Sequence, residues 1–405
     1  MTSVAAERMP DIGAGLRDVI EAVWRPEQTG VAVSLGAARR RQPHVESYFI
    51  LPHPSRPRLL LPADDVRSAR RALGAYRGLR TGQAEAWARL IRASVLSSPT
   101  ASRLLRQLHV HAGSEAETLL PQLAELLDYP GRLLAMLAVR QPGPSSKATI
   151  GLLDEAGRPV AFAKLGSSEQ TDMMVRNEAL ALSEVKGRLP TIFTSAVRAE
   201  TTWHGHPVTM MAPLPLDARR LTVEPLRMPQ PLLEVASSGD FGDREVSGSS
   251  YANRLMARLE TCAPTHREVA DALMRWCRQL CDPPGQLRFG RSHGDWVSWN
   301  LGTHRGRLVV WDWEQSVRDA PVGFDACHWY FQRSRAHRGF NAAVAAVDAV
   351  APGLVRLGVR AEDTARVADL YLLETCVGGL ELPASAGSEG DVRAFGELAR
   401  RRVER

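Results

Sequence analysis

The sequence predicts an α+β protein, with antiparallel strands in its first half and helices in its second. Strand-like runs separated by turn residues occupy residues 148–165 and 191–212, which is the pattern of β-hairpins. After residue 250, apolar residues recur at helical spacing. A length of 405 residues exceeds one ordinary hydrophobic core, so we expect two or three domains.

The first 130 residues contain both strand-like and helical patterns, and no catalytic motif is recognised in them. A short helix is predicted at 14–24, followed by strands at 30–35, 47–51 and 58–61. Helices are then predicted at 63–76, 81–96, 102–108 and 115–127. His109 and His111 are expected at a helix-to-loop transition, and a metal-ligand pair is the alternative.

The central residues predict two hairpins, one from 148–153 and 160–165, the other from 191–197 and 207–212. His204 and His206 stand at the tip of the second hairpin and are expected to face solvent. Residues 132–139 are either a helix end or a strand. Residues 234–250 are rich in Ser, Gly and Asp and predict a loop or an insert. The later helices are predicted at 251–262, 266–280, 326–333, 340–350, 361–375 and 391–402.

Composition narrows the class of protein. The chain is 44% hydrophobic and 24% charged, as soluble globular proteins are, and its net charge is +6. An anionic partner such as ATP or nucleic acid would suit that charge, but abundant arginine on a solvated surface is the favoured explanation. No Lys/Arg run is interleaved with aromatic residues, so no nucleic-acid partner is predicted.

The five cysteines and the absence of targeting signals predict a location. Their number is odd and no C-x-x-C pair occurs, which fits a reducing compartment. Cys277 and Cys281 are one helical turn apart, and two facing buried thiols are favoured over a metal site. The first residues lack the apolar core of a signal peptide, and no run of about 20 apolar residues was found. We therefore expect a cytoplasmic protein with no membrane partner.

Two neighbouring segments, 292–300 (SHGDWVSWN) and 309–314 (VVWDWE), carry the most informative residues. Asp295 and Asn300 have the D-x-x-x-x-N spacing of a kinase catalytic loop, in which the Asp accepts the hydroxyl proton and the Asn binds Mg²⁺. Asp312 follows the predicted strand 307–311, where a second Asp would bind Mg²⁺. His293 is expected to brace the loop. The alternative is that Asp295 and Asn300 are ordinary turn residues.

At these residues the sequence resembles the aminoglycoside phosphotransferase and choline kinase family, which has a protein-kinase-like fold. The matching residues are His293-Gly294-Asp295, Asn300 and Asp312-Trp313-Glu314. The resemblance extends from about residue 132 to the C-terminus. It implies a bilobal molecule with a small antiparallel β lobe at 131–214 and a large helical lobe at 215–405. Residues 1–130 lie outside the resemblance and are expected to form an additional N-terminal α/β cap-like region, by topological analogy with some sugar kinases of the same superfamily.

A second signature of the resemblance lies in the predicted small lobe. Lys164 is near the end of the strand 160–165, where kinases place a lysine that binds the α- and β-phosphates of ATP. The predicted helix 171–186 offers Glu178 as the carboxylate that holds this lysine, with Glu184 as the alternative partner.

The resemblance also implies the remaining nucleotide contacts. The loop containing Ser145 and Ser146 would cover the phosphates, although a plain hairpin turn is the alternative. The segment 210–214, including Met211, would border the adenine base.

The segment after Asp312 departs from protein kinases. Twelve residues separate Asp312 from Asp325, which leaves no room for a long activation loop, and Gly294 replaces the Arg of His-Arg-Asp. Asp325 is expected either to orient the catalytic loop or to cap the next helix. Glu374 and Glu381 are either amine-binding residues of an acceptor pocket or ordinary surface acids.

The sequence therefore predicts an enzyme that uses ATP and Mg²⁺ to phosphorylate a hydroxyl group of a small molecule, such as a sugar, an amino sugar or an amino alcohol. Two alternatives are a nucleotide-binding pseudokinase that acts as an interaction module, and a peptide or protein kinase. The acceptor and the oligomeric state are not predicted.

Overall fold

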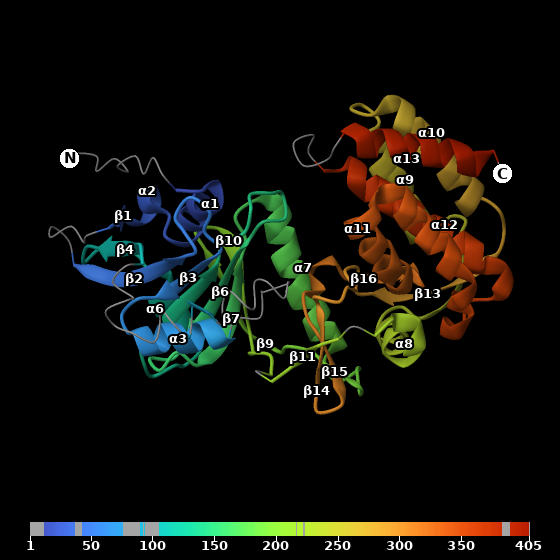
Figure 1. Cartoon of the computed structure of the whole chain (residues 1–405). Helices are drawn as coiled ribbons and strands as arrows, with labels where there is room; N and C mark the ends of the chain where they lie inside the picture. Colours follow the sequence, from blue (N-terminus) through green and yellow to red (C-terminus); the bar gives the residue numbers. More distant parts are fainter. Residues whose placement is uncertain are drawn as a thin grey trace. The chain divides into compact units, whose positions relative to one another are not determined.

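A computed structural model describes residues 12–36, 43–75, 90–91, 93, 105–215, 217–221, 223–382 and 389–404. The chain forms two compact units. Unit 1 comprises Met1–Ala179 and Ser195–Leu216, and unit 2 comprises Leu180–Thr194 and Asp217–Arg405. Strands dominate unit 1 and helices dominate unit 2 (Figure 1), so the predicted α+β class is confirmed.

Unit 1 is built on one nine-stranded antiparallel sheet with the order β1-β4-β2-β3-β5-β6-β7-β10-β9. Its strands are β1 (Val31–Leu35), β2 (His44–Leu51), β3 (Leu59–Pro62), β4 (Gln107–Ala112), β5 (Leu134–Ala138), β6 (Ala148–Leu153), β7 (Pro159–Leu165), β9 (Val197–Trp203) and β10 (His206–Met211). Its helices are α1 (Ala14–Val23), α2 (Pro26–Thr29), α3 (Val66–Ala75), α6 (Leu119–Leu126) and the first part of α7 (Glu169–Val185).

Both faces of the sheet are buried at β3, where successive residues point to opposite sides. Leu16 and Ile20 of α1 pack in a core cluster that contains Leu60 of β3. On the other face, Leu73 of α3 packs in a cluster that contains Leu61, the next residue of the same strand. Helices on both sides therefore fix the register of the sheet.

The sheet continues across residue 130, since β3 pairs with β5. Strands from the predicted cap-like region and from the predicted small lobe thus belong to one sheet. The division of the chain at residue 130 stays a prediction about domains.

Several N-terminal expectations are confirmed and two are wrong. The helix at 14–24 and the three strands that follow it are present. The predicted helix 102–108 is wrong in its described part, because Gln107 already belongs to β4, and His109 and His111 lie within that strand. His109 Nδ1 is 2.7 Å from Ser47 Oγ on β2. The predicted helix 81–96 lies almost wholly outside the described residues.

A buried carboxylate ties α1 to the sheet. Glu46 accepts hydrogen bonds from Tyr48 Oη, at 2.6 Å, and from Trp24 Nε1, at 3.1 Å. Burial raises the pKa of Glu46 above 4.5, although both hydrogen bonds oppose the shift. The folded protein therefore keeps this proton at pH values where the unfolded chain has lost it, and stability declines as the pH rises from about 4.5 through the raised pKa.

We expect Glu46→Gln, which is neutral at every pH, to flatten that decline. Urea unfolding midpoints measured between pH 4.5 and 8 would show it, with the exposed residue Glu21 changed to Gln as the control. Parallel pH curves for wild type and Glu46→Gln would contradict the expectation.

Unit 2 contains two small sheets and a set of helices. One sheet has the order β11-β14-β15-β8 and the other β12-β13-β16. The strands are β8 (Ile192–Phe193), β11 (Arg219–Arg220), β12 (Gly242–Glu245), β13 (Gln286–Ser292), β14 (Leu301–His304), β15 (Arg307–Val310) and β16 (Val317–Pro321). The α-helices are α8 (Pro229–Ser237), α9 (Ser250–Cys262), α10 (Arg267–Cys281), α11 (Phe324–Val350), α12 (Thr364–Leu380) and α13 (Glu389–Val403), and α7 ends in this unit.

Two expectations for this part of the chain are wrong. The segment 191–197 is not one strand of a hairpin: Ile192–Phe193 pairs in parallel with β15, and the hairpin strand that pairs with β10 runs from Val197 to Trp203. Residues 234–250 are not a plain loop, since they include the end of α8 and the strand β12. The predicted contact of Cys277 with Cys281 is confirmed, with the sulfurs 3.9 Å apart.

One described helical segment, Phe324–Leu357, meets the length and composition test for a membrane span, contrary to the expectation from sequence. Core helices of water-soluble proteins pass the same test, and this segment packs against α12 inside unit 2. Gly339, with φ 79°, interrupts its helical geometry.

Candidate active site

The loop that carries Asp295 begins at the end of β13, a strand buried between β12 and β16. Gly294 makes this loop possible. Its φ of +82° is in the left-handed region, and a Cβ at this position would lie 2.1 Å from the carbonyl oxygen of Gln315. The Gly of the His-Gly-Asp motif is thus required by the path of the chain.

His293 joins this loop to the segment that carries Asp312. The side chain is fully buried; Nδ1 accepts a hydrogen bond from the backbone N–H of Asp295, at 3.2 Å, and Nε2 lies 3.1 Å from the carbonyl oxygen of Trp311. Burial lowers the pKa of His293 despite nearby carboxylates. A neutral ring that accepts at Nδ1 and donates at Nε2 satisfies both contacts, which is the bracing geometry expected from the sequence.

Asp325, in the first turn of α11, holds the same loop through its carboxylate. It accepts hydrogen bonds from the backbone N–H groups of His293, at 2.8 Å, and Gly294, at 3.0 Å, and from Ser292 Oγ, at 2.8 Å. Of the two roles that the sequence left open, orientation of the loop is therefore the one present, since the helix has no side-chain cap.

Asp325→Asn should destabilise the protein by about 2–4 kcal/mol, because charge-assisted bonds to buried donors are lost or weakened. Chemical denaturation would measure the loss, and the exposed Asp271→Asn is a matched control. A change no larger than that of Asp271→Asn would mean that the three bonds do not hold the loop.

Asp295 and Asn300 lie side by side in unit 2. Asn300 Nδ2 donates to Asp295 Oδ2, at 2.8 Å, and to the Asp295 carbonyl, at 3.1 Å. Asn300 is buried, whereas the Asp295 side chain is 31% exposed. The amide nitrogen thus holds the carboxylate, and the amide oxygen of Asn300 is the atom suited to bind a cation.

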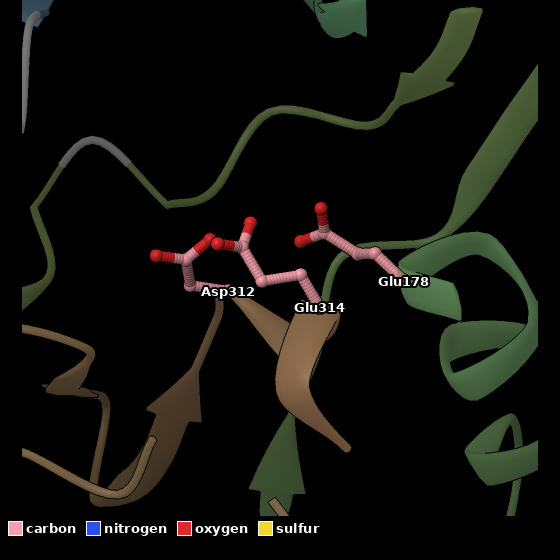
Figure 2. A group of neighbouring side chains, drawn as sticks. All are labelled: Glu178, Asp312 and Glu314. Carbon is pink, nitrogen blue, oxygen red and sulfur yellow. The ribbon is translucent and has the colours of Figure 1, made fainter. Parts of the chain in front are cut away.

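Asp312 and Glu314 project from the turn after β15 (Figure 2). Each offers a carboxylate oxygen, and these two oxygens lie within 4.8 Å of each other. Asp312 has the left-handed backbone angle φ 69°, a conformation uncommon outside glycine and one that recurs at functional sites. Two carboxylates at this spacing, both oxygen donors, fit a hard divalent cation such as Mg²⁺.

Unit 1 contains the predicted ion pair. Lys164 Nζ is 2.5 Å from Glu178 Oε2, and both side chains are buried, with 9% and 3% exposed. Lys164 lies on β7 between Thr149 of β6 and Thr209 of β10, and Glu178 is on α7 (Figure 2). Glu184, the alternative partner, instead pairs with Arg291 and Arg318 in unit 2.

The other predicted nucleotide contacts lie in the same unit. Ser145 is exposed and Ser146 half-buried in a tight turn between β5 and β6, where the Ser146 N–H donates to the carbonyl of Gly143. The turn leads into Ala148, which pairs with Leu165 next to Lys164. Met211 is buried at the end of β10, two residues after the partner of Lys164. Their roles stay predictions.

Some weaker candidates prove to be engaged elsewhere. Glu374 and Glu381 both pair with the single guanidinium of Arg258, so each of these acids contacts an arginine of this chain. His206 is half-buried rather than solvent-facing, and its Nδ1 lies 3.0 Å from Asp172 Oδ1. His204 is exposed, as expected, and its Nε2 lies 3.3 Å from Glu117 Oε2.

Two residues near Asp295 were missed from the sequence. His328, on α11, has Nε2 3.1 Å from Asp295 Oδ1, and Tyr371, on α12, has its hydroxyl 3.2 Å from His328 Nδ1. The only sequence signal for His328 is its place one helical turn after Asp325. Tyr371 is 43 residues further along the chain and gives no local signal.

Comparison with known proteins finds no matching family model and no matching curated protein. Among solved structures, the chain is similar to an amicoumacin kinase in complex with AMP-PNP and Ca²⁺, with 10% identity, coverage of 66% of this chain and 88% of that chain, and a TM-score of 0.42. A Plasmodium vivax ethanolamine kinase shares 11% identity, with 67% and 82% covered and a TM-score of 0.41. A choline kinase from Streptococcus pneumoniae shares 15% identity, with 67% and 89% covered and a TM-score of 0.40. The chain is thus similar to solved structures of small-molecule kinases, and the choline kinase is one of them.

Proposed function

We propose that this protein is a phosphotransferase that moves the γ-phosphoryl group of ATP to a hydroxyl group of a small molecule. The observation that supports it best is that the Asp295 side chain is both partly exposed and held by hydrogen bonds. This carboxylate is partly exposed, yet Asn300 and His328 each hold one of its oxygens. Such a fixed and accessible acceptor suits a substrate hydroxyl.

In the proposed reaction, the acceptor oxygen forms a bond to the γ-phosphorus while the bond from that phosphorus to the β,γ-bridging oxygen breaks, leaving ADP. Asp295 takes the hydroxyl proton. Because the transition state of phosphoryl transfer is loose, the larger part of the catalysis is positioning and charge stabilisation. The hydrogen bonds that fix Asp295 therefore matter as much as its basicity.

Asp312 and Asn300 would hold Mg²⁺, and Glu314 adds a third oxygen donor beside Asp312. The cation, when bound, neutralises charge on the phosphate oxygens. Carboxylate and amide oxygens are the ligands that Mg²⁺ prefers, and none of the three residues is a softer sulfur or imidazole ligand.

Lys164, held by Glu178, would bind the α- and β-phosphates of ATP. The hydroxyls of Ser145 and Ser146 would cover the phosphates, and the backbone near Met211 would border the base. We expect such an enzyme in the cytoplasm, where ATP is available.

A small acceptor is favoured over a protein because β16 and α11 follow Asp312 almost directly. The residues between Asp312 and Asp325 form a single 3-10 turn and β16, which pairs with β13. They leave no segment comparable to the activation loop on which protein kinases bind peptides.

The test is incubation with [γ-³²P]ATP, Mg²⁺, and a panel of sugars, amino sugars and amino alcohols, followed by separation by molecular size. We expect label in a small phosphomonoester. Label on added lysate proteins would favour a protein kinase. Nucleotide binding with no transfer to any acceptor would favour a pseudokinase.

A further inference from the structure

We infer that His328 and Tyr371 are positioning residues that fix the Asp295 carboxylate for the acceptor hydroxyl. The inference rests on the proposed function, because it assigns a role within that same site. Three side chains from three different parts of unit 2 form a continuous hydrogen-bonded series, Tyr371–His328–Asp295.

The two oxygens of Asp295 are held by different N–H groups. Asn300 Nδ2 lies 2.8 Å from Oδ2, and His328 Nε2 lies 3.1 Å from Oδ1. A carboxylate held at one oxygen can still rotate about its Cβ–Cγ bond, whereas one held at both has its plane fixed. The directions of the remaining lone pairs on the two oxygens are therefore fixed as well.

Tyr371 sets the tautomer of His328. The Tyr371 side chain is buried, and burial raises the pKa of its hydroxyl well above 10, so the hydroxyl remains protonated and able to donate. Donation to His328 Nδ1 places the ring proton on Nε2, which is the atom that faces Asp295. The opposite tautomer would set a nitrogen lone pair against a carboxylate oxygen.

Packing holds Tyr371 in place independently of its hydroxyl. Its ring makes edge contacts with Phe324 and Phe331 of α11, with centroids 5.7 and 5.9 Å apart, and with His328 itself, at 6.1 Å. Tyr371→Phe should preserve these contacts and remove only the donor. The substitution thus isolates the hydrogen bond from the packing.

The helix α11 consequently fixes both the backbone of the loop and the side chain of Asp295. Asp325 on α11 holds the backbone at His293 and Gly294, and His328, one turn later, holds the side chain of Asp295. The first contact keeps the loop folded and the second orients the reacting group. Loss of His328 should therefore affect kcat rather than nucleotide binding.

The experiment compares four single variants and one double variant of the full-length enzyme, with an acceptor that it phosphorylates. We expect His328→Ala to lower kcat about 10- to 100-fold with the KM for ATP unchanged, the range typical of misplaced reacting groups. His328→Gln, whose amide N–H can reach the same oxygen, should recover most of that loss. His337→Ala, at an exposed position of the same helix, should have no effect.

Tyr371→Phe should lower kcat about 3- to 10-fold in wild type, and it should add nothing in the His328→Gln background, which has no tautomer to set. If the losses in kcat caused by Tyr371→Phe and His328→Gln were additive in the double variant, Tyr371 would not act through His328, and the inference would be overturned. A His328→Ala enzyme with wild-type kcat, or a His328→Gln enzyme as impaired as His328→Ala, would also overturn it.

A readout independent of turnover is the ¹⁵N NMR spectrum of the histidine side chains, with His328 assigned by its absence in His328→Gln. We expect the Nε2–H tautomer in wild type and a mixture in Tyr371→Phe. An Nδ1–H tautomer in wild type would overturn the inference. If the enzyme phosphorylates no acceptor but shows the expected tautomer, the proposed function fails while the hydrogen-bonded series stands.

Discussion

Asp295→Asn should lower kcat for phosphoryl transfer by about 10³-fold while leaving ATP affinity within about twofold of wild type. The substitution removes the negative charge and the proton acceptor but keeps the size of the side chain. Asn300 and His328 donate to the two carboxylate oxygens, so an amide nitrogen in one of these positions would face a donor. The loss should therefore combine absent basicity with a misoriented side chain.

Steady-state kinetics together with nucleotide titration would measure both quantities. The exposed Asp271→Asn, in the same unit, controls for the general effect of losing a surface carboxylate. Near-wild-type turnover by Asp295→Asn would show that another group accepts the proton, or that no acceptor is needed.

Lys164→Met should have the second largest effect, a fall of about 10²- to 10³-fold in kcat/KM for ATP. The lysine is buried and paired with Glu178, so its charge is held at one place on β7. Arginine is not an equivalent replacement, because its planar guanidinium needs more room than a compact ammonium. Lys164→Arg should therefore be impaired as well.

The chain offers a matched control, since it has only three lysines and Lys186 is exposed. Lys186→Met should retain wild-type kcat/KM for ATP. Glu178→Gln should show a smaller loss than Lys164→Met, because the lysine keeps its charge but loses its anchor. Equal kinetics in Lys164→Met and Lys186→Met would remove Lys164 from the nucleotide site.

The parts of the candidate site that the sequence predicts are those encoded by short spacing. Asp295 and Asn300 are five residues apart, and their contact follows from a single loop. Lys164 and Glu178 are separated by one strand-to-helix connection, and their ion pair is likewise present. In both cases the chain has few ways to separate the two side chains.

His328 and Tyr371 could not be found in this way, because helix packing brings them to Asp295 over 33 and 76 positions of sequence. For the same reason, the sequence could not show what Glu374 and Glu381 contact. Their positions on and after α12 are readable from sequence, but their shared partner Arg258 is on α9. Only tertiary packing decides whether an acid faces a substrate or an arginine.

The β4 strand shows how tertiary pairing overrides local preference. Residues 102–108 are rich in Leu and Arg, which favour helices. Residues 107–112, however, alternate polar and apolar side chains, and β1 and β2 pair with them on both sides. Two neighbouring strands outweigh a weak helical propensity, and the sheet extends by one strand at the expense of a helix.

The most direct measurement is a ³¹P NMR time course of wild-type protein with MgATP and a pool of amino sugars and amino alcohols. The proposed function predicts that the γ-phosphate resonance of ATP decays as a phosphomonoester resonance grows, and that Asp295→Asn abolishes this growth. Decay of ATP to inorganic phosphate alone, or an unchanged spectrum with nucleotide bound, would contradict transfer to a small-molecule hydroxyl.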